Sequence, residues 1–270
     1  MTIHLRSITL RDDQPLPDGF PFDVPVIKHL QTLTFDAPVT FFVGENGSGK
    51  STVLEAIATA CNLPTIGSTD TAQDKTLDGI RALSQRLKWA WNKRVRSGFF
   101  MRSEDFFGFT RRIAEEVHYL EGQLRADDGH AGQSEFARRL SKQPYANDYH
   151  ALKHLYGDDG LDTQSHGESY FKLFRARFRP GGLHLMDEPE APLSPNRQLT
   201  LIAMLHKMVA QNAQFIISTH SPIILAYPNA TIYNFVGGRI ERAEYDSLEH
   251  VQIMRDFLNN PNAYLRHLIT

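Results

Sequence analysis

The sequence predicts an α/β fold in which antiparallel strands precede a mostly parallel core sheet that contains a helical insertion. Three observations support this prediction. Strand-like and helix-like patterns alternate near both ends of the chain, a glycine-rich loop joins a strand to a helix, and the middle third lacks strong strand patterns. Such alternation is typical of sheets built from strand–helix–strand units.

The first part of the chain is rich in β-forming residues. Residues 2–10 alternate polar and apolar side chains, and residues 24–43 contain the runs VPVIKHLQTLTF and VTFFV, divided by a turn at Pro38. We therefore expect three strands here. The following segment, SGKSTVLEAIATAC, has helical spacing. A strand, a glycine loop and a helix thus follow one another.

The middle of the chain resembles a helical insertion. The patterns predict a loop over 62–78, helices over 79–97 and 104–125, and a short helix near 134–141. An apolar run, GFFM, interrupts them at 98–101. We expect one domain over residues 1–270, with an α/β lobe formed by 1–78 and 171–270 and a helical subdomain over 79–170.

The α/β pattern resumes with the run GGLHLMDEP, an apolar strand that ends in two carboxylates. A helix is expected over 195–211 and a strand, FIIST, over 215–219. The segments TIYNFV and RIERAEY are expected to pair as a hairpin around Gly237 and Gly238.

Composition limits the cellular setting. The 270 residues are 41% apolar and 22% charged, and the single cysteine, Cys61, cannot form an internal disulfide, which favours a reducing compartment. The segment MTIHLRSITLRDD lacks the apolar core of a signal peptide, and no apolar run reaches the roughly 18 residues of a membrane span. We therefore expect a cytoplasmic protein with no membrane insertion of its own.

Residues 44–51, GENGSGKS, match the pattern G-x-x-x-x-G-K-[ST] at every fixed position. Glycines allow backbone N–H groups to converge on an anion, and the following helix adds the positive end of its dipole. Lys50 is expected to pair with the β and γ phosphates, and the Ser51 hydroxyl to bind Mg²⁺. The predicted nucleotide-binding residues here are Gly44, Glu45, Asn46, Gly47, Ser48, Gly49, Lys50, Ser51 and Thr52.

Acidic and imidazole side chains follow two of the predicted strands. Asp187, at a strand tip, is expected to bind Mg²⁺ together with Ser51, and Glu188 to orient an attacking water. His220, after FIIST, is expected to sense the γ phosphate. The predicted catalytic residues are therefore Glu188, His220 and Lys50. An acidic strand edge and a surface histidine are the alternatives.

The ordered motifs GENGSGKS, QSHGES, LHLMDEPEAPLS and IISTHSP resemble those of the ABC-type ATPases. The resemblance is closer to stand-alone bacterial members related to chromosome-maintenance and recombination-repair ATPases. It implies ATP hydrolysis, with ATP and Mg²⁺ as cofactors, and an ATP-dependent head-to-tail homodimer. By position, Ser165 and Gly167 match the signature motif that contacts the nucleotide of the opposite subunit. Ser194 replaces the aspartate of the D-loop.

Two other family features are weakly marked. The nearest candidates for the Q-loop glutamine position are Ser103 and Glu104, and those for an adenine contact are Arg11 and Phe22. His150 and His154 have helical spacing, but surface histidines are a better interpretation than a metal site.

The sequence is compatible with more than one biological process and partner. Residues 79–112 contain nine basic residues and two acids, with Trp89 and Trp91 among them. This pattern suits nucleic acid, although a solvated helix face with inward tryptophans explains it too. We expect a switch in a nucleic-acid-associated or defence process. The alternatives are the ATPase subunit of a membrane transporter and a non-hydrolytic module that recruits an effector protein. The 137 positions from Lys50 to Asp187 exclude a long coiled coil.

Overall fold

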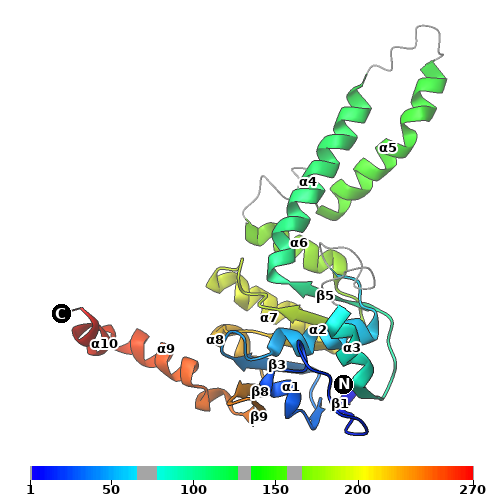
Figure 1. The fold of residues 1–270 in the computed structure, drawn as a ribbon. Coiled ribbons are helices and arrows are strands. Elements are labelled where there is room, and N and C mark those ends of the chain that lie inside the picture. The colour runs from blue at the N-terminus through cyan, green and yellow to red at the C-terminus, as the bar shows by residue number, and fades with distance from the viewer. Residues whose placement is uncertain (1, 66–77, 127–134, 157–165, 270) are drawn as a thin grey trace.

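The core of the chain is a six-stranded sheet with the order β5-β6-β7-β3-β8-β9 (Figure 1). The computed structural model describes residues 2–65, 78–126, 135–156 and 166–269. All neighbouring strands are parallel except the antiparallel pair β8–β9. Their bounds are β3 (Val39–Gly44), β5 (Gly98–Arg102), β6 (Leu183–Asp187), β7 (Gln214–Ser218), β8 (Thr231–Val236) and β9 (Arg239–Ala243). The mostly parallel core and the β8–β9 hairpin were both predicted from the sequence.

A smaller antiparallel sheet has the order β2-β1-β4 and contains β1 (Leu5–Leu10), β2 (Thr32–Thr34) and β4 (Leu87–Trp91). The buried side chain of Gln214 at the start of β7 ties this sheet to the core. Its amide oxygen accepts hydrogen bonds from the backbone N–H groups of His4 and Leu5, each at 2.9 Å, and its amide nitrogen donates to the Leu5 carbonyl. The predicted antiparallel strands at the N-terminus are confirmed.

Helices cover both faces of the core sheet. On one face α2 (Lys50–Cys61) and α3 (Asp78–Arg86) pack against strand residues such as Phe42 and Ile216. On the other face α6 (His166–Arg177) and α7 (Pro195–Ala210) pack against Phe41 and Phe215. Because both faces are covered, β3, β6 and β7 are apolar along nearly their whole length.

Two local predictions are wrong. The helix expected over 79–97 ends at Arg86, and the next residues form β4, while the run at 98–101 lies in strand β5 at the edge of the core sheet. Pairing of β4 with β1 and of β5 with β6 overrides the helical pattern. Within the strand expected over 24–35, Pro25 begins a short helix, α1 (Pro25–Lys28).

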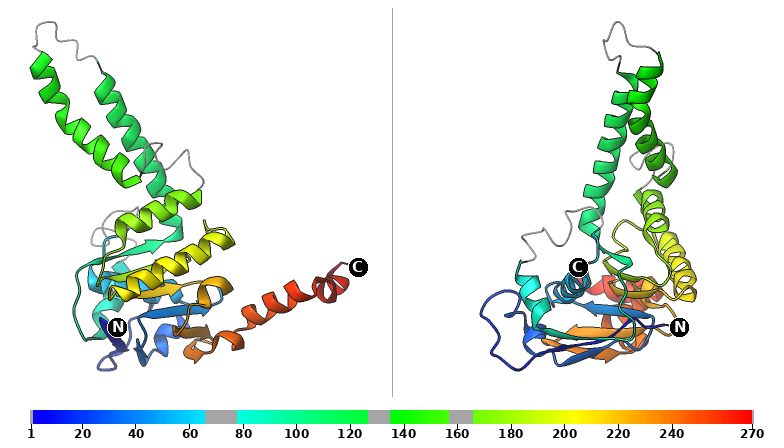
Figure 2. Two further views of the ribbon diagram at one scale, coloured as in Figure 1. Left: turned by 180° about the vertical axis from the view of Figure 1, so that it is seen from behind. Right: turned by 90° about the vertical axis from the view of Figure 1, so that its right-hand side faces the viewer.

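The helical insertion projects from the body as a hairpin of α4 (Ser103–Arg125) and α5 (Glu135–Tyr156), as both views of Figure 2 show. Lys142 donates a hydrogen bond to the Leu124 carbonyl, and the Tyr149 hydroxyl donates to Glu121, which joins the two helices. Helix α5 is longer than the predicted segment near 134–141. None of the helices in the described ranges is long and apolar enough to cross a membrane.

The carboxyl-terminal elements form a second projection, which the sequence patterns did not predict. After α8 (Pro222–Leu225) and the hairpin, a short 3-10 helix, η2 (Tyr245–Ser247), leads into α9 (Glu249–Asn259) and α10 (Pro261–Leu268). These two helices extend away from the sheets in a direction different from that of the α4–α5 hairpin (Figures 1 and 2).

We predict that His184 in β6 makes folding sensitive to acid. Its ring packs within 5.3 Å of the rings of Phe99, Phe178 and Phe215, and this burial lowers its pKa from 6.5 to about 4. Below pH 6.5 the unfolded chain therefore binds a proton that the folded chain excludes. The free energy of unfolding should fall by on the order of 3 kcal/mol between pH 6.5 and pH 4 from this residue alone.

Urea denaturation of wild type and His184→Phe across that pH range tests this prediction. The variant should lose less stability on acidification, and His154→Phe, at an exposed position, should behave as wild type. Parallel curves for wild type and His184→Phe would contradict it.

Candidate functional site

The candidate site lies where three neighbouring core strands end. In the parallel register Asp187 of β6 pairs with Ser218 of β7, and Ser218 pairs with Phe42 of β3. Asp187 is the last residue of β6 and Glu188 follows it, while His220 lies two residues after β7 and the glycine loop begins at Gly44, the last residue of β3. The structure therefore brings together the three sequence motifs that were expected to surround one nucleotide.

The loop between β3 and α2 has a backbone that requires glycine at several positions. The φ angles of Gly44, Gly47 and Gly49 are +144°, +80° and +99°. Gly49 is the N-cap of α2, so the N–H groups of the first helical turn have no acceptor within the helix. A loop of this geometry at a helix N-terminus suits a bound phosphate.

The Lys50 side chain lies inside this loop and is 5% exposed. Its ammonium group donates hydrogen bonds to the carbonyl oxygens of Gly44 at 2.6 Å and Glu45 at 2.9 Å. Burial lowers the pKa of Lys50, while the charges of Asp187, Glu188 and Glu190 oppose that shift. One ammonium group thus faces three carboxyl groups.

Glu188 occupies a left-handed backbone conformation with φ of +50°. Its N–H donates to the Ser218 carbonyl at 2.9 Å, which fixes the turn after β6 against the end of β7. The Glu188 Oε1 atom lies 3.7 Å from Nε2 of His220, and both side chains are partly exposed. Non-glycine residues in this conformation are uncommon and concentrate at functional sites.

Glu190 fixes the backbone of the residue that follows β7. Its Oε1 atom accepts a hydrogen bond of 2.7 Å from the His220 N–H. Burial raises the pKa of Glu190, and burial followed by the charge of Lys50 lowers the pKa of His220. His220 is therefore neutral near pH 7, and its contact with Glu188 is that of a neutral imidazole.

The residues present fit a divalent cation. The Oδ1 atom of Asp187 is buried and has no hydrogen-bond partner among the described residues, and Ser51 lies in the first turn of α2. A carboxylate and a hydroxyl are ligands that Mg²⁺ accepts alongside phosphate oxygens and water. The described residues contain no cluster of three or more His, Cys, Asp or Glu side chains that would hold a metal alone.

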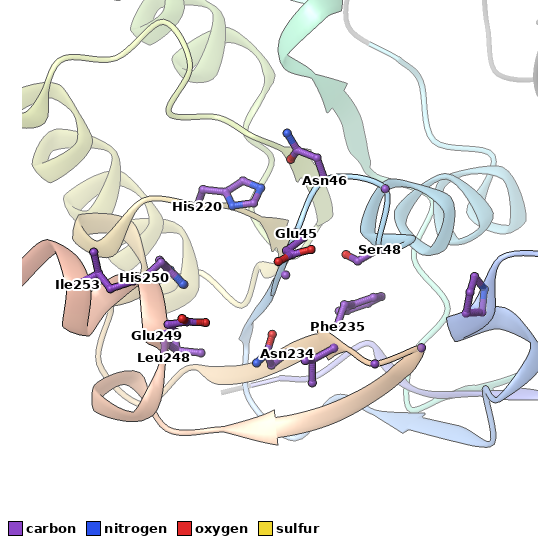
Figure 3. Close-up of a pocket in the computed structure, with 16 residues that line it drawn as sticks. Glu45, Asn46, Ser48, His220, Asn234, Phe235, Leu248, Glu249, His250 and Ile253 are labelled. Atoms are coloured by element: carbon purple, nitrogen blue, oxygen red, sulfur yellow. The ribbon is translucent and has the colours of Figure 1, made fainter. Parts of the chain in front are cut away.

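Two cavities adjoin the glycine loop. The larger, of about 700 Å³, lies between Gly44–Ser48, His220, the β8–β9 turn and the start of α9 (Figure 3). The smaller, of about 360 Å³, is lined by Phe20 and Val24 together with Lys50, Ser51 and Glu188. The site thus has room for a ligand on both sides of the loop.

Phe20 is a candidate ligand contact that the sequence patterns did not single out. Its ring is 63% exposed beside the residues of the glycine loop, whereas Phe22, one of the two candidates for an adenine contact, is 3% exposed and packs in the core. Burial of its ring makes Phe22 unsuitable for that contact. The sequence feature that could have identified Phe20 is that an aromatic residue stands two positions before Phe22.

Several predicted contacts are not placed at the site. Ser165 lies outside the described residues, and Gly167 falls in the first turn of α6. Ser103 and Glu104 begin α4 directly after β5, whose last residue pairs with Asp187. Ser194 is the N-cap of α7.

Part of the basic stretch at 79–112 is engaged in contacts within the chain. The Trp89 indole donates to the Ser84 carbonyl, and both tryptophans pack against the core. Arg102 forms a half-buried ion pair of 2.8 Å with Glu55, and Arg86 donates to Gln14. These contacts favour the structural interpretation of this stretch over a nucleic-acid surface.

Comparisons with known proteins find similarity to ATP-binding proteins. A family described as an AAA domain matches residues 22–87. The cobalt import ATP-binding protein CbiO of Salmonella paratyphi A is 26% identical over 223 residues, which cover 81% of this chain and 74% of the relative. An ABC transporter ATP-binding protein of Methanosarcina acetivorans is 26% identical over 215 residues, covering 78% and 74%.

Solved structures with some similarity include a nucleotide-free ATP-binding cassette from an ABC transporter, with 19% identity, a TM-score of 0.47 and 96% coverage of each chain. An SMC head domain from Thermotoga maritima has 16% identity and a TM-score of 0.40, covering 90% of this chain and 100% of that one.

The fold and the site define an α/β P-loop protein. The chain is similar in sequence to ATP-binding proteins of ABC transporters.

We predict that two glycines of the loop differ in their tolerance of a side chain. A Cβ on Gly44 would lie 2.6 Å from the Phe235 carbonyl oxygen on the paired strand β8, whereas one on Gly47 meets nothing within 4 Å. Gly47→Ala should cost about 1 kcal/mol, from its positive φ alone, and Gly44→Ala about 1–3 kcal/mol more. Urea denaturation measures both, and equal losses would contradict the steric argument.

Proposed function

We propose that this protein binds and hydrolyses ATP at the glycine loop, and that it works as an ATP-dependent homodimer. The observation that supports this most is the convergence of Lys50, Asp187, Glu188 and His220 at one edge of the sheet, where the charges of Asp187 and Glu188 act on the pKa values of Lys50 and His220. Phosphoryl transfer needs a phosphate cradle, a metal-binding carboxylate and a group that orients water at one place.

Each side chain has a distinct task in this proposal. Lys50 and the first-turn N–H groups of α2 bind the phosphates, and Glu188 orients the attacking water for in-line displacement. His220, neutral and held by Glu190 through its N–H, donates to the terminal phosphate. Mg²⁺, when bound by Ser51 and Asp187, neutralises charge on the phosphates.

The charge balance of the site supports the proposal that a second copy of the chain is needed to complete the nucleotide site. Among the described residues that line the two cavities, Lys50 is the one lysine or arginine, and Glu45, Glu188 and Glu249 are acidic. A triphosphate needs further donors in the transition state. The signature residues Ser165 and Gly167 of a second copy, arranged head to tail, would supply a hydroxyl and helix N-terminal N–H groups.

A role in driving transport across a membrane is the second candidate output. It rests on the printed names of the related proteins, which include a cobalt import ATP-binding protein. Both the switch and the transport role require access to ATP, which the cytoplasm provides, so we propose a cytoplasmic location. A nucleic-acid-associated or defence role draws less support, since Trp89 and several basic side chains are engaged within the chain.

We predict that Glu188→Gln separates nucleotide binding from turnover. The variant keeps the shape of the side chain but loses the carboxylate, so ATP should bind within a few-fold of wild type while hydrolysis falls by at least about 100-fold. The variant should also accumulate as a dimer with ATP and Mg²⁺, because the bound nucleotide is not consumed. Phosphate release and size-exclusion chromatography with light scattering measure these effects.

Glu241→Gln, at an exposed position on β9, is the matched control and should leave turnover and assembly unchanged. Equal rates of hydrolysis for wild type and Glu188→Gln would remove Glu188 from its assigned role.

We predict that Phe20 contributes to nucleobase binding by stacking. Phe20→Ala should weaken ATP binding by about 10-fold, since an aromatic–base stack contributes about 1–3 kcal/mol, while Phe20→Tyr should restore it. The maximal rate at saturating ATP should change little, because Phe20 does not touch the reacting phosphate. Fluorescent-nucleotide titration and steady-state kinetics test this, and unchanged affinity in the alanine variant would contradict the assignment.

A further inference from the structure

The carboxyl-terminal arm, defined as α9, α10 and Ile269, makes few contacts with the rest of the chain among the residues that the structure describes. Its main contacts among the described residues are between α9 and α10 and between α9 and η2. The arm leaves the body in the views of Figures 1 and 2, so the sheets and their covering helices do not shield it. Most of the length of the arm is therefore accessible to solvent or to another molecule.

The arm carries more exposed apolar surface than two solvated helices need. Its exposed apolar side chains are between 47% and 75% accessible: Ile253, Met254, Leu258, Leu268 and Ile269. Its own packing includes the ring contact of Phe257 with Tyr264, at 5.8 Å. Helices of 11 and 8 residues are marginal in water by themselves. The arm thus has the character of an interface element without its partner.

The root of the arm forms part of the nucleotide site. Leu248, Glu249, His250 and Ile253 line the 700 Å³ cavity opposite the glycine loop and His220 (Figure 3). His250, in the first turn of α9, and His220 line the same cavity. A molecule that closes this cavity from outside must lie beside the first turn of α9.

The charge of the arm distinguishes between classes of occupant. Residues 249–269 contain two acidic side chains, Glu249 and Asp256, and two basic ones, Arg255 and Arg266. Anionic lipid and nucleic acid both favour an excess of basic residues, which this segment lacks. Balanced charges around apolar side chains suit a protein surface.

We propose that the carboxyl-terminal arm docks on a second copy of this chain, next to the nucleotide site, and stabilises the dimer. The inference rests on the proposed function, which places a second copy over the cavity that the root of the arm lines. In a two-fold dimer each of the two arms contacts the other copy. The exposed apolar side chains of the arm are therefore buried at two equivalent places in the dimer. The arm extends the nucleotide-dependent contact beyond the site itself.

The test uses the full chain with Glu188→Gln as the parent, so that bound ATP persists. Leu258→Glu with Leu268→Glu places charges on the apolar patch, away from the residues that line the cavity. Tyr119→Glu with Leu140→Glu is the matched control, because these side chains are 52% and 59% exposed on the α4–α5 hairpin. Sedimentation velocity with ATP and Mg²⁺ gives the dimer dissociation constant, and titration with a fluorescent ATP analogue at low protein concentration gives nucleotide affinity.

The dimer dissociation constant should rise at least about 10-fold in the arm variant and stay unchanged in the control, with nucleotide affinity of the monomer within about twofold of the parent. A photo-crosslinking residue at position 258 should join two copies in the presence of ATP. Both results together support the proposal, because a merely unfolded arm would not produce the crosslink.

Equal dimerisation of parent and arm variant would overturn the proposal while leaving ATP hydrolysis in place. A parent that binds ATP but stays monomeric would overturn it as well. Loss of binding to anionic lipid vesicles in the arm variant, with normal dimerisation, would identify a membrane as the occupant and reject a second copy. Absence of ATP binding by the parent would contradict the proposed function and this inference together.

Discussion

The parallel register of β3, β7 and β6 is the constraint on which the site depends. Asp187 pairs with Ser218, and Ser218 pairs with Phe42, so the ends of β6 and β7 lie at one level, and β3 continues for two residues to Gly44, where the glycine loop begins. Slipping one strand by a single residue would move Asp187 toward the apolar side and a core residue such as Met186 to the edge. The apolar residues along these strands resist that slip, because both helical layers bury them. Core packing therefore sets the positions of charged groups that take no part in it.

Local backbone geometry adds what the register alone does not provide. Glu188 has a left-handed conformation that costs about 1–3 kcal/mol for a non-glycine residue. Its N–H bond to the Ser218 carbonyl and the bond from the Ala191 N–H to its own carbonyl hold this conformation. Glu190 in turn fixes His220 through a backbone hydrogen bond across the two loops. The turn after β6 and the turn after β7 are thus one connected unit. This connection requires Glu188 and Glu190 to lie close to the end of β6.

Sequence patterns predicted those parts of the fold that depend on local residues. The strand–loop–helix unit around Lys50 and the acid-tipped strand β6 have strong local patterns, so both were found with nearly correct bounds. Strands β4 and β5 were missed because their stability comes from pairing with β1 and β6, which are distant in sequence. Phe20 and Phe22 have the same residue type, and only the packing of the loop decides which ring enters the core. The arm has ordinary helical patterns, and its relation to the cavity depends on tertiary structure alone.

The electrostatics of the site connect the metal, the nucleotide and the second copy. Three carboxyl groups, those of Asp187, Glu188 and Glu190, act on the single ammonium group of Lys50. A triphosphate that enters such a site is repelled by these carboxylates at short range, so binding requires added positive charge. A divalent cation beside Asp187 would reverse the sign of the local field, and helix N-terminal dipoles from a partner would add to it. In the proposed function, the acidic groups that would serve catalysis would therefore also make tight nucleotide binding conditional on Mg²⁺ and on assembly, which is the property that a switch requires.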